Sequence, residues 1–577
     1  MSDRARLWTL ALGGAAAMFL IQPPADLWPL AWLAPLPWLR LAQAPDLPGR
    51  RPWRVMWVAG FMHWLATIHW LRLPHPATAI GWVALSAYLA AYVPLFVWIA
   101  RRLVNRWGWP LVAAAPVAWM ACEHLRGTLL GGFTFGGLGH TQWRWTALIQ
   151  CADAAGAVGV SGIVMAAAAG IAAVVPDRRS TRRRPAFAEG ACAAAVVVFA
   201  VVYGQWRIAT APVPGGESFE VLLVQGSIDT ELKHDPDAAA DVARHYDDVT
   251  MRGLAVDSER PPDLVVWPET MWRVGLLEID AAAVFSEAEI EAALGPIAES
   301  PAESPADRQR RYRELLERQR LDAIAPFAAR YGTTWLVGLD RQRLLSTDPL
   351  RWESFNAAVF LDATGKPLAC YDKMHPVMFG EYVPFADRFP FLYRLTPLPG
   401  GLTAGRSPVA LDIAGHRVAP TICYETALPE AVRMIVRSLE ATGERPDVIV
   451  NLTNDGWFWG SSELDMHLVA SVFRAVEVRT PVVIAANTGF SAAIDGCGRL
   501  LVRGPRREPE PLRVRVRPDG RRSPWLVAGS AVAGACLAVA GAVLLEALMR
   551  GGCRRQAVAA GGNPPGGLRR PESRADL

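Results

Sequence analysis

The chain has 577 residues, of which 52% are hydrophobic, and a formal net charge of only +4. So small a charge over this length argues against a nucleic-acid-binding protein, which would need a broad basic face. Eight cysteines include no C-x-x-C pair, which argues against a zinc knuckle or a thioredoxin-type redox motif, and no disulfide framework is expected. The 23 tryptophans suit a membrane protein, since tryptophan collects at the membrane–water interface.

Apolar segments long enough, or nearly so, to cross about 30 Å of hydrocarbon define the first part of the chain. They lie at 8–23, 27–43, 55–71, 78–100, 109–122, 155–176, 187–204 and 524–548. The sequence therefore predicts a membrane domain of about seven transmembrane helices over residues 1–210 and one closing transmembrane helix over 524–548. The short second and fifth segments are open to being tilted or partly re-entrant.

Clusters of arginine give these segments an orientation. The clusters precede the first span, separate the second from the third, and follow the fourth, the sixth and the last. All five fall on one side if all eight segments span, and the positive-inside rule makes that side the cytoplasm. The domain between the seventh and eighth spans is then expected to face the periplasm or outer surface. The cytoplasmic tail 551–577, rich in Gly, Pro and Arg, is predicted to be disordered.

Residues 217–518 have the charge density of a soluble domain. Short β-branched runs alternate there with helical patterns, which indicates a layered α/β domain. Strands are expected at 219–224, 264–266, 334–337, 356–361, 418–422, 448–452 and 482–486, and helices at 308–331, 427–441 and 463–479. The segment 278–307 is rich in Ala, Glu, Pro and Ser and is expected to be an insertion outside the core.

Three strand ends carry reactive side chains. Glu269 follows an apolar strand, with Pro268 fixing the turn. Lys373 comes after the strand 356–361 and its turn, and Cys423 ends a strand where a helix is expected to begin. A thiol at such a turn lies near backbone N–H groups, which favour a thiolate and a developing oxyanion. A base, a cation and a soft nucleophile are together what acyl transfer through a thioester needs.

In this chain order, the three residues resemble the Glu-Lys-Cys triad of the nitrilase superfamily, whose fold is an αββα sandwich. The resemblance is closest to the membrane-anchored branch, the apolipoprotein N-acyltransferases, and covers nearly the whole chain. The motifs that carry it are Val224-Gln225-Gly226, Trp267-Pro268-Glu269, Lys373 with the run 379–384, Cys423-Tyr424-Glu425, the run 454–458 and the run 474–477. It implies a multi-span α-helical membrane bundle joined to an extracytoplasmic nitrilase-like α/β domain in the bacterial inner membrane.

The resemblance also implies a reaction in two steps. Cys423 would take an acyl chain from a phospholipid as a thioester, and the α-amino group of the diacylglyceryl-cysteine of an apolipoprotein would then receive it. Glu269 would be the base, and Lys373 would stabilise the oxyanion. No metal or organic cofactor is needed, the partners are the phospholipid donor and the apolipoprotein acceptor, and a monomer is expected.

Supporting roles follow from the same resemblance. Glu381 would orient Lys373 or the amine, and Tyr424 and Glu425 would shape the site beside the nucleophile. Trp457 begins an aromatic run that is expected to be either core packing or a lipid-contacting lid. On a later helix, His467, Arg474 and Glu477 share one face, where a structural network is favoured.

Two positions depart from the family pattern. His234 stands where the family usually has tryptophan, and Met378 precedes Phe379 where the family more often has proline. Two rival functions also stay open. One is a membrane-tethered amidase or nitrilase that hydrolyses a small amide, and the other is a membrane scaffold whose catalytic domain has degenerated.

Overall fold

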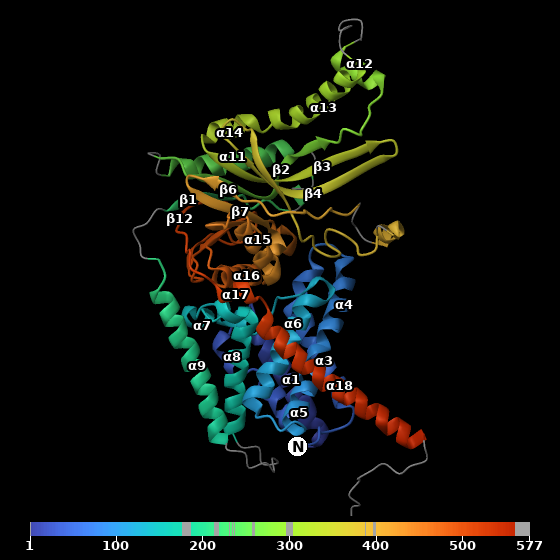
Figure 1. The fold of residues 1–577 in the computed structure, drawn as a ribbon, viewed down its shortest axis with the longest axis vertical. Coiled ribbons are helices and arrows are strands. Elements are labelled where there is room, and N and C mark those ends of the chain that lie inside the picture. The colour runs from blue at the N-terminus through green and yellow to red at the C-terminus, as the bar shows by residue number, and fades with distance from the viewer. Residues whose placement is uncertain are drawn as a thin grey trace, which may run out of the picture.

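The protein is described here from a computed structural model that covers residues 2–175, 186–212, 218–229, 231–232, 235, 237–256, 260–295, 304–386, 388–395 and 400–559. Two bodies are stacked end to end, a bundle of helices and a two-sheet α/β domain on one end of it (Figure 1). The predicted class, a helical membrane bundle with a nitrilase-like α/β domain, is confirmed.

The bundle is built from the N-terminal part of the chain and completed by the C-terminal helix. Its α-helices are α1 (Asp3–Leu20), α2 (Leu36–Gln43), α3 (Pro52–Thr67), α4 (Thr78–Ala90), α5 (Tyr92–Asn105), α6 (Leu111–Thr128), α7 (Thr146–Ile149), α8 (Ala152–Val174), α9 (Ala186–Ala209), α17 (Pro524–Ala528) and α18 (Ala531–Ala559). Among the residues that the structure describes, four stretches are long and apolar enough to cross a membrane: Thr78–Asn105, Ala152–Val174, Phe187–Ala209 and Ala531–Arg550. The other expected spans form shorter or more charged helices of the same bundle.

The second expected span is not one continuous helix. It consists of the 3-10 turn η1 (Trp28–Trp32) and the short helix α2, with Pro35 between them. Proline lacks an N–H and blocks the preceding turn, so a chain with prolines this closely spaced cannot keep one α-helix through them.

Basic residues gather at the end of the bundle away from the α/β domain. Arg101 donates to the carbonyls of Leu41 and Pro45, each at 3.0 Å, and Arg106 pairs with Glu546 at 2.7 Å. The N-terminus lies at this same end (Figure 1). The arginines of the cluster after the sixth span lie outside the described residues. Arg101, Arg106 and the N-terminus therefore lie at one end of the bundle, the end away from the α/β domain.

Two helices run further than the sequence indicated. Helix α6 continues through Thr128, beyond the apolar segment 109–122, so Glu123 and Arg126 are helical and buried; Glu123 accepts from the Leu138 N–H at 2.9 Å. Helix α18 continues through Ala559, so the disorder predicted for 551–577 is wrong for its first part. Extending an existing helix needs no new nucleation, which outweighs a weak composition. Residues 560–577 lie outside the described part.

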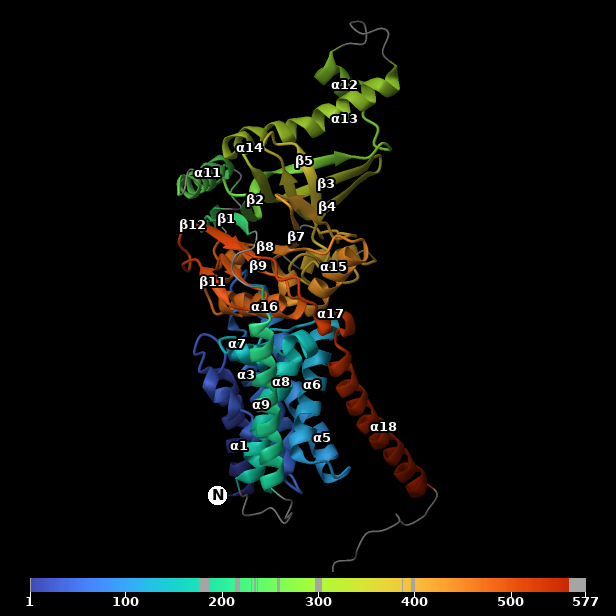
Figure 2. The same cartoon turned by 60° about the vertical axis from the view of Figure 1, so that its left-hand side comes forward.

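The closing apolar segment contains a break. Helix α17 ends at Gly529, which has φ +57° and ψ −142°, and α18 starts two residues later. Only glycine adopts this conformation readily. Helix α18 then packs Cys536, Ala540 and Val543 into the bundle core before it leans away from the other helices (Figure 2).

The α/β domain contains two sheets of six strands. The first has the order β12-β1-β2-β3-β4-β5 and the second β11-β10-β9-β8-β7-β6. Their bounds are β1 (Phe219–Gln225), β2 (Leu264–Ile279), β3 (Thr334–Thr347), β4 (Leu350–Leu361), β5 (Pro367–Asp372), β6 (Leu411–Ile413), β7 (His416–Ile422), β8 (Val448–Thr453), β9 (Val482–Ala486), β10 (Ala492–Ile494), β11 (Leu500–Arg503) and β12 (Glu510–Val516). All seven expected strands are present, although β2, β3 and β4 are much longer than expected.

Helices cover both outer faces, which gives the expected αββα order. Helices α11 (Ala239–Ala255) and α14 (Ala325–Tyr331) lie on the first sheet, and α15 (Pro429–Ala441) and α16 (Glu463–Val478) on the second. All residues of α16 except Asp465 are buried, because one face packs on the sheet and the other on helix α8 of the bundle. A helix buried all round needs such a double cover.

The predicted insertion 278–307 begins where β2 ends. Helices α12 (Glu287–Leu294) and α13 (Pro305–Asp322) project from the end of the domain away from the bundle (Figure 1). Ala283 is fully buried there in a small cluster with Ile279 and Leu344, separate from the main core. Residues 296–303 lie outside the described part.

A buried ionic junction joins the two bodies. The carboxylate of Asp153, on α8, accepts from Arg479 of the α/β domain at 2.5 Å and from Arg207 of α9 at 2.6 Å. Asp153 and Arg479 are both fully buried. Since a buried charge is tolerated only when paired, this junction fixes how the α/β domain sits on the bundle.

We expect Asp153→Asn to lower the free energy of unfolding by about 3–5 kcal/mol, because it keeps the volume but leaves two buried guanidinium groups without their counter-charge. Chemical denaturation in detergent would measure this. Asp241→Asn, in an exposed pair with Arg244, is the matched control and should change stability by less than about 0.5 kcal/mol. Equal effects of the two variants would contradict the assignment.

Candidate active site

Glu269 lies in an irregular stretch of β2. The register of β2 against β3 shifts between Trp267 and Trp272, and Thr270 has φ +52°. The irregularity brings the chain against Gly338 of β3, where an added Cβ would lie 2.3 Å from the carbonyl of Pro268. A glycine is therefore required on the neighbouring strand for Glu269 to turn toward the gap between the sheets.

Lys373 follows β5 and is held between two carboxylates. Its Nζ lies 2.7 Å from Oε1 of Glu381 and 3.3 Å from Oε1 of Glu269. Only 2% of Lys373 is exposed. Burial alone would lower the pKa of Lys373, but the two carboxylates outweigh it and raise that pKa well above the usual value. The lysine is therefore an ammonium ion at any physiological pH.

Neutral donors fix the carboxylate of Glu269 from two further directions. Asn356 Nδ2 donates to Oε1 at 2.6 Å, and the backbone N–H of Asn454 donates to Oε2 at 2.9 Å. Both oxygens of Glu269 are thus engaged, and the residue is 7% exposed. The carboxylate is held in one orientation by groups from β4 and from the turn after β8.

Cys423 lies at the sharp turn after β7. Its φ is +52°, and the helix expected there is the 3-10 turn η7 (Cys423–Ala427), with α15 starting at Pro429. Burial, followed by the charge of Glu269, raises the pKa of the Cys423 thiol well above its usual value, while Lys373 acts to lower it. Desolvation of the sulfur thus opposes the thiolate that the neighbouring backbone N–H groups favour, and it outweighs the effect of the cation. The charges of Glu269 and Lys373 act on the pKa of Cys423, and Glu269 and Cys423 act on that of Lys373, so the three side chains lie in one site.

Glu425 ties the lysine segment to the nucleophile turn. Its fully buried carboxylate accepts from the backbone N–H groups of Met374, His375 and Ile422, at 2.8, 3.1 and 2.7 Å. The hydroxyl of Tyr371 also donates to it, at 2.8 Å. One side chain thus fixes the distance between the segment that carries Lys373 and the turn that carries Cys423.

The other expected supporting residues lie around this centre. The hydroxyl of Tyr424 donates to the carbonyl of Gly132 at 3.0 Å, so its side chain reaches the loop between α6 and α7. Trp457 is half-buried in the turn η8 (Asp455–Phe458), directly after Asn454. Its neighbour Phe458 packs on Trp70 of the bundle, with ring centres 5.1 Å apart, whereas Trp459 is exposed.

Sequence reasoning missed two members of the site and misplaced a third. Asn356 was expected only as the start of a strand, and Asn454 only as part of a motif. His467 was grouped with Arg474 and Glu477, but its Nε2 lies 3.1 Å from the carbonyl of Cys423, whereas Arg474 pairs with Glu477 at 2.8 Å. Helical spacing gave the common face correctly and could not give the partners.

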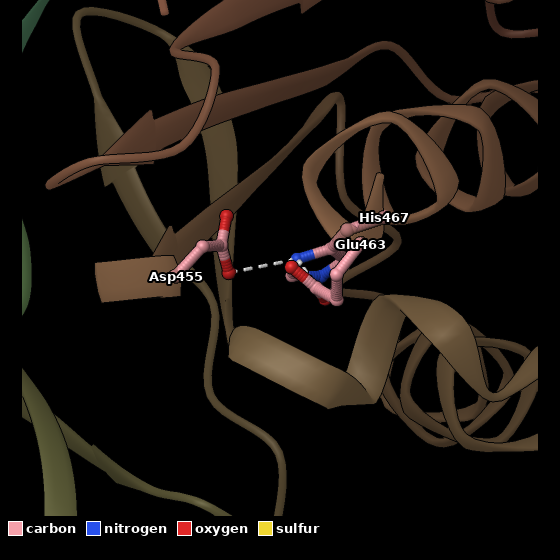
Figure 3. A group of neighbouring side chains, drawn as sticks. All are labelled: Asp455, Glu463 and His467. Atoms are coloured by element: carbon pink, nitrogen blue, oxygen red, sulfur yellow. Dashed lines mark hydrogen bonds and ion pairs between the residues drawn. The ribbon is translucent and has the colours of Figure 1, made fainter. Parts of the chain in front are cut away.

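His467 belongs to a buried group with Asp455 and Glu463 (Figure 3). The ligand-type atoms of these three residues lie within 4.8 Å of one another. Asp455 already accepts from His467 Nδ1 at 3.1 Å and from the Thr453 hydroxyl at 2.8 Å. Asp455 and His467 are therefore already engaged in hydrogen bonds within the protein, next to the turn that carries Cys423.

Of the two departures from the family pattern, His234 lies outside the described residues. Met378 lies in the loop after Lys373, where it pairs with Tyr382. It also approaches Gly131 of the bundle, whose added Cβ would lie 3.2 Å from the Met378 methyl group. The Met378 side chain therefore contacts the membrane domain directly.

Known proteins resemble the chain over both bodies. The family described as "Apolipoprotein N-acyltransferase N-terminal domain" matches residues 14–170, and the family "Carbon-nitrogen hydrolase" matches residues 238–521. Apolipoprotein N-acyltransferase of Geobacter metallireducens is 30% identical over 554 residues, which are 94% of this chain and 95% of that protein. The protein of the same name from Rhodopirellula baltica is 28% identical over 91% of this chain and 95% of its own length.

Likeness to solved structures is weaker. An amidase from Nesterenkonia sp. is 17% identical, covers 54% of this chain and 95% of its own, and has a TM-score of 0.33. On the evidence of the curated relatives, this chain is of the carbon-nitrogen hydrolase class with a membrane domain. It belongs to the apolipoprotein N-acyltransferase family.

We expect Glu269→Gln to lower the pKa of the Cys423 thiol, because it removes a negative charge beside the sulfur while Lys373 stays. Alkylation of Cys423 by iodoacetamide, followed by mass spectrometry between pH 6 and 10, measures this. In the unaltered protein the midpoint should lie above that of free cysteine, about pH 8.5, and in the variant it should move to lower pH. Glu444→Gln, at an exposed carboxylate, should leave it unchanged. An upward shift in Glu269→Gln would contradict the arrangement.

Proposed function

We propose that the protein transfers a fatty acyl chain from a phospholipid to the α-amino group of the diacylglyceryl-cysteine at the N-terminus of apolipoproteins. The observation that carries this is the placement of Cys423 beside Glu269 and Lys373 on a turn seated on the membrane bundle. Thr134 of the bundle loop donates to the carbonyl of Ala427 at 2.6 Å, close to where Tyr424 reaches Gly132. A thiol held there meets lipid substrates at the membrane surface.

In the first step, the sulfur of Cys423 attacks the ester carbonyl of the phospholipid. Glu269 takes the thiol proton, a carbon–sulfur bond forms, and the ester carbon–oxygen bond breaks. The same proton passes to the leaving glycerol oxygen, and a lysophospholipid departs. The ammonium of Lys373 stabilises the oxyanion, and its fixed charge needs no rearrangement at that moment.

In the second step, the amine of the apolipoprotein attacks the thioester. A carbon–nitrogen bond forms, the carbon–sulfur bond breaks, and Glu269 takes a proton from the amine and returns one to the thiolate of Cys423. Only the unprotonated amine can attack the thioester. The buried carboxylate of Glu269 removes a proton from that amine as the carbon–nitrogen bond forms.

The remaining residues position this machinery. Glu381 holds the Lys373 ammonium, and Glu425 holds the two reactive segments at a fixed distance. Tyr424 anchors the nucleophile turn to the bundle. We assign Trp457 to the wall of the site next to Asn454, where an aromatic ring suits an acyl chain.

The same proposal includes location and state. The protein is a monomer that crosses the bacterial inner membrane several times, with the catalytic domain in the periplasm. The gathering of arginines at the opposite end supports this orientation through the positive-inside rule.

Incubation with phospholipid alone should give an acyl adduct on the intact protein, visible by mass and released by hydroxylamine, because a thioester forms before any acceptor binds. Cys423→Ala should carry no adduct. Lys373→Met should form it about 100- to 1,000-fold more slowly, as expected for loss of an oxyanion-stabilising group.

Cys370→Ala is the matched control, since Cys370 is a partly buried thiol on β5, and it should acylate normally. Bound lipid without an adduct, together with turnover of a small soluble amide, would overturn the transferase proposal in favour of an amidase. An adduct that persists in Cys423→Ala would overturn the assignment of the nucleophile.

Orientation has its own test in spheroplasts. A membrane-impermeant maleimide should label Ala441→Cys, an exposed position in the catalytic domain, before permeabilisation. It should label Arg50→Cys, an exposed position at the basic end, only after permeabilisation. The parent protein gives the background. Labelling of Arg50→Cys in intact spheroplasts would reverse the topology.

A further inference from the structure

The nucleophile turn holds a residue in an unfavourable conformation. Cys423 has φ +52°, a region in which a Cβ crowds the following carbonyl. Such a conformation persists only when neighbouring groups impose it. The part of the turn that is held is the carbonyl of Cys423 itself, which accepts from Asn451 Nδ2 at 3.2 Å and from His467 Nε2 at 3.1 Å.

The ring of His467 faces oxygen acceptors on both sides. Nε2 faces the carbonyl of Cys423, and a carbonyl oxygen can only accept. Nδ1 faces Oδ1 of Asp455 at 3.1 Å (Figure 3). The form of the ring that donates to both of these acceptors is the imidazolium, with a hydrogen on each nitrogen.

The surroundings support the charged form. Glu463 Oε1 lies 4.0 Å from Nδ1, and all three side chains of the group are buried. Burial alone would lower the pKa of His467, but Asp455 and Glu463 outweigh it and raise that pKa to about 9. Hydrogen bonds from a charged donor are about twice as strong as neutral ones, so the carbonyl of Cys423 is held firmly.

The element that carries His467 is rigid. Helix α16, apart from Asp465, is buried between the second sheet and the bundle. The hydroxyl of Ser471, one turn after His467, donates to the carbonyl of His467 at 3.3 Å and lies 3.2 Å from the Thr426 hydroxyl. Thr426 in turn contacts His467 Nε2 at 3.2 Å. The ring of His467 is thus fixed relative to the second sheet. Its hydrogen bond to the carbonyl of Cys423 then holds the turn in a fixed position as well.

We propose that His467, paired with Asp455, is a positioning residue that holds the Cys423 turn through its backbone carbonyl and so aims the thiol at the acyl donor. This rests on the proposed role of Cys423. His467 touches neither the sulfur nor the substrate, so its loss slows acylation without changing phospholipid binding.

Two amide variants separate reach from polarity. In His467→Gln the amide nitrogen takes the place of Nε2 and can still donate to Cys423. In His467→Asn it takes the place of Nδ1, next to Asp455, and cannot reach the carbonyl. Both are buried polar residues, so a fold that accepts one is expected to accept the other. Ser471→Ala alters the same network without touching the carbonyl and is the control.

The measurement is the first-order rate of acyl-adduct formation at rising phospholipid concentration, with the unaltered protein alongside. His467→Asn should lower the maximal rate about 10- to 100-fold, the effect of losing one hydrogen bond from a charged donor. His467→Gln and Ser471→Ala should stay within about threefold of the unaltered rate. The phospholipid concentration for half the maximal rate should not move in any variant.

Equal slowing in the Gln and Asn variants would overturn the proposal, as would normal rates in both. A rise in the half-saturating concentration at an unchanged maximal rate would also overturn it, since the residue would then act in binding. Absence of an adduct in the unaltered protein would instead count against the proposed function, which keeps the two failures distinguishable.

Discussion

The burial of one ammonium ion between two carboxylates is the constraint on which the site depends. Lys373 has almost no contact with water, and its charge is tolerated because Glu381 and Glu269 lie at 2.7 and 3.3 Å. A buried ion missing its partner costs several kcal/mol, so the segments that carry these residues must keep their positions. These segments belong to β2, the end of β5 and the loop that follows it. The long β2–β4 region of the first sheet and the Glu425 hydrogen bonds thus serve the same requirement.

The charge balance of this cluster also explains the state of the thiol. Two carboxylates and one ammonium leave a net negative charge beside Cys423, and burial adds to it, so the pKa of the thiol is raised. In the proposed reaction this keeps the resting enzyme protonated and unreactive. When an ester carbonyl enters, attack by the sulfur moves the negative charge onto the carbonyl oxygen. Lys373 then stabilises that oxyanion. Activation then depends on the substrate, which suits an enzyme surrounded by other electrophiles.

Much of the fold could be predicted because its signals are local. β-Branched runs marked seven strands, and Cys423 follows the apolar strand β7 as expected, whereas Glu269 lies inside β2, where the register of that strand shifts. What failed depends on tertiary contacts. Asn356 looks like any strand residue until β4 brings it to Glu269 at 2.6 Å. The raised pKa of the Cys423 thiol reflects burial of the sulfur. The sequence argument considered only the backbone N–H groups near Cys423 and could not show that burial. Helix α6 extends beyond its apolar segment because the carboxylate of Glu123 accepts a hydrogen bond from the Leu138 N–H.

The membrane bundle contributes to the chemistry by supporting the second sheet. The outer face of helix α16 rests on α8 of the bundle, and all residues of α16 except Asp465 are buried. The ionic junction of Asp153 with Arg207 and Arg479 fixes the α/β domain on the bundle. The hydrogen bond from Tyr424 to Gly132 fixes it at a second point, beside Cys423. A shift of the bundle against the domain would therefore move the Cys423 turn before it disturbed Glu269 or Lys373, which hang from the first sheet. The position of Cys423 relative to Glu269 therefore depends on the bundle as well as on the two sheets.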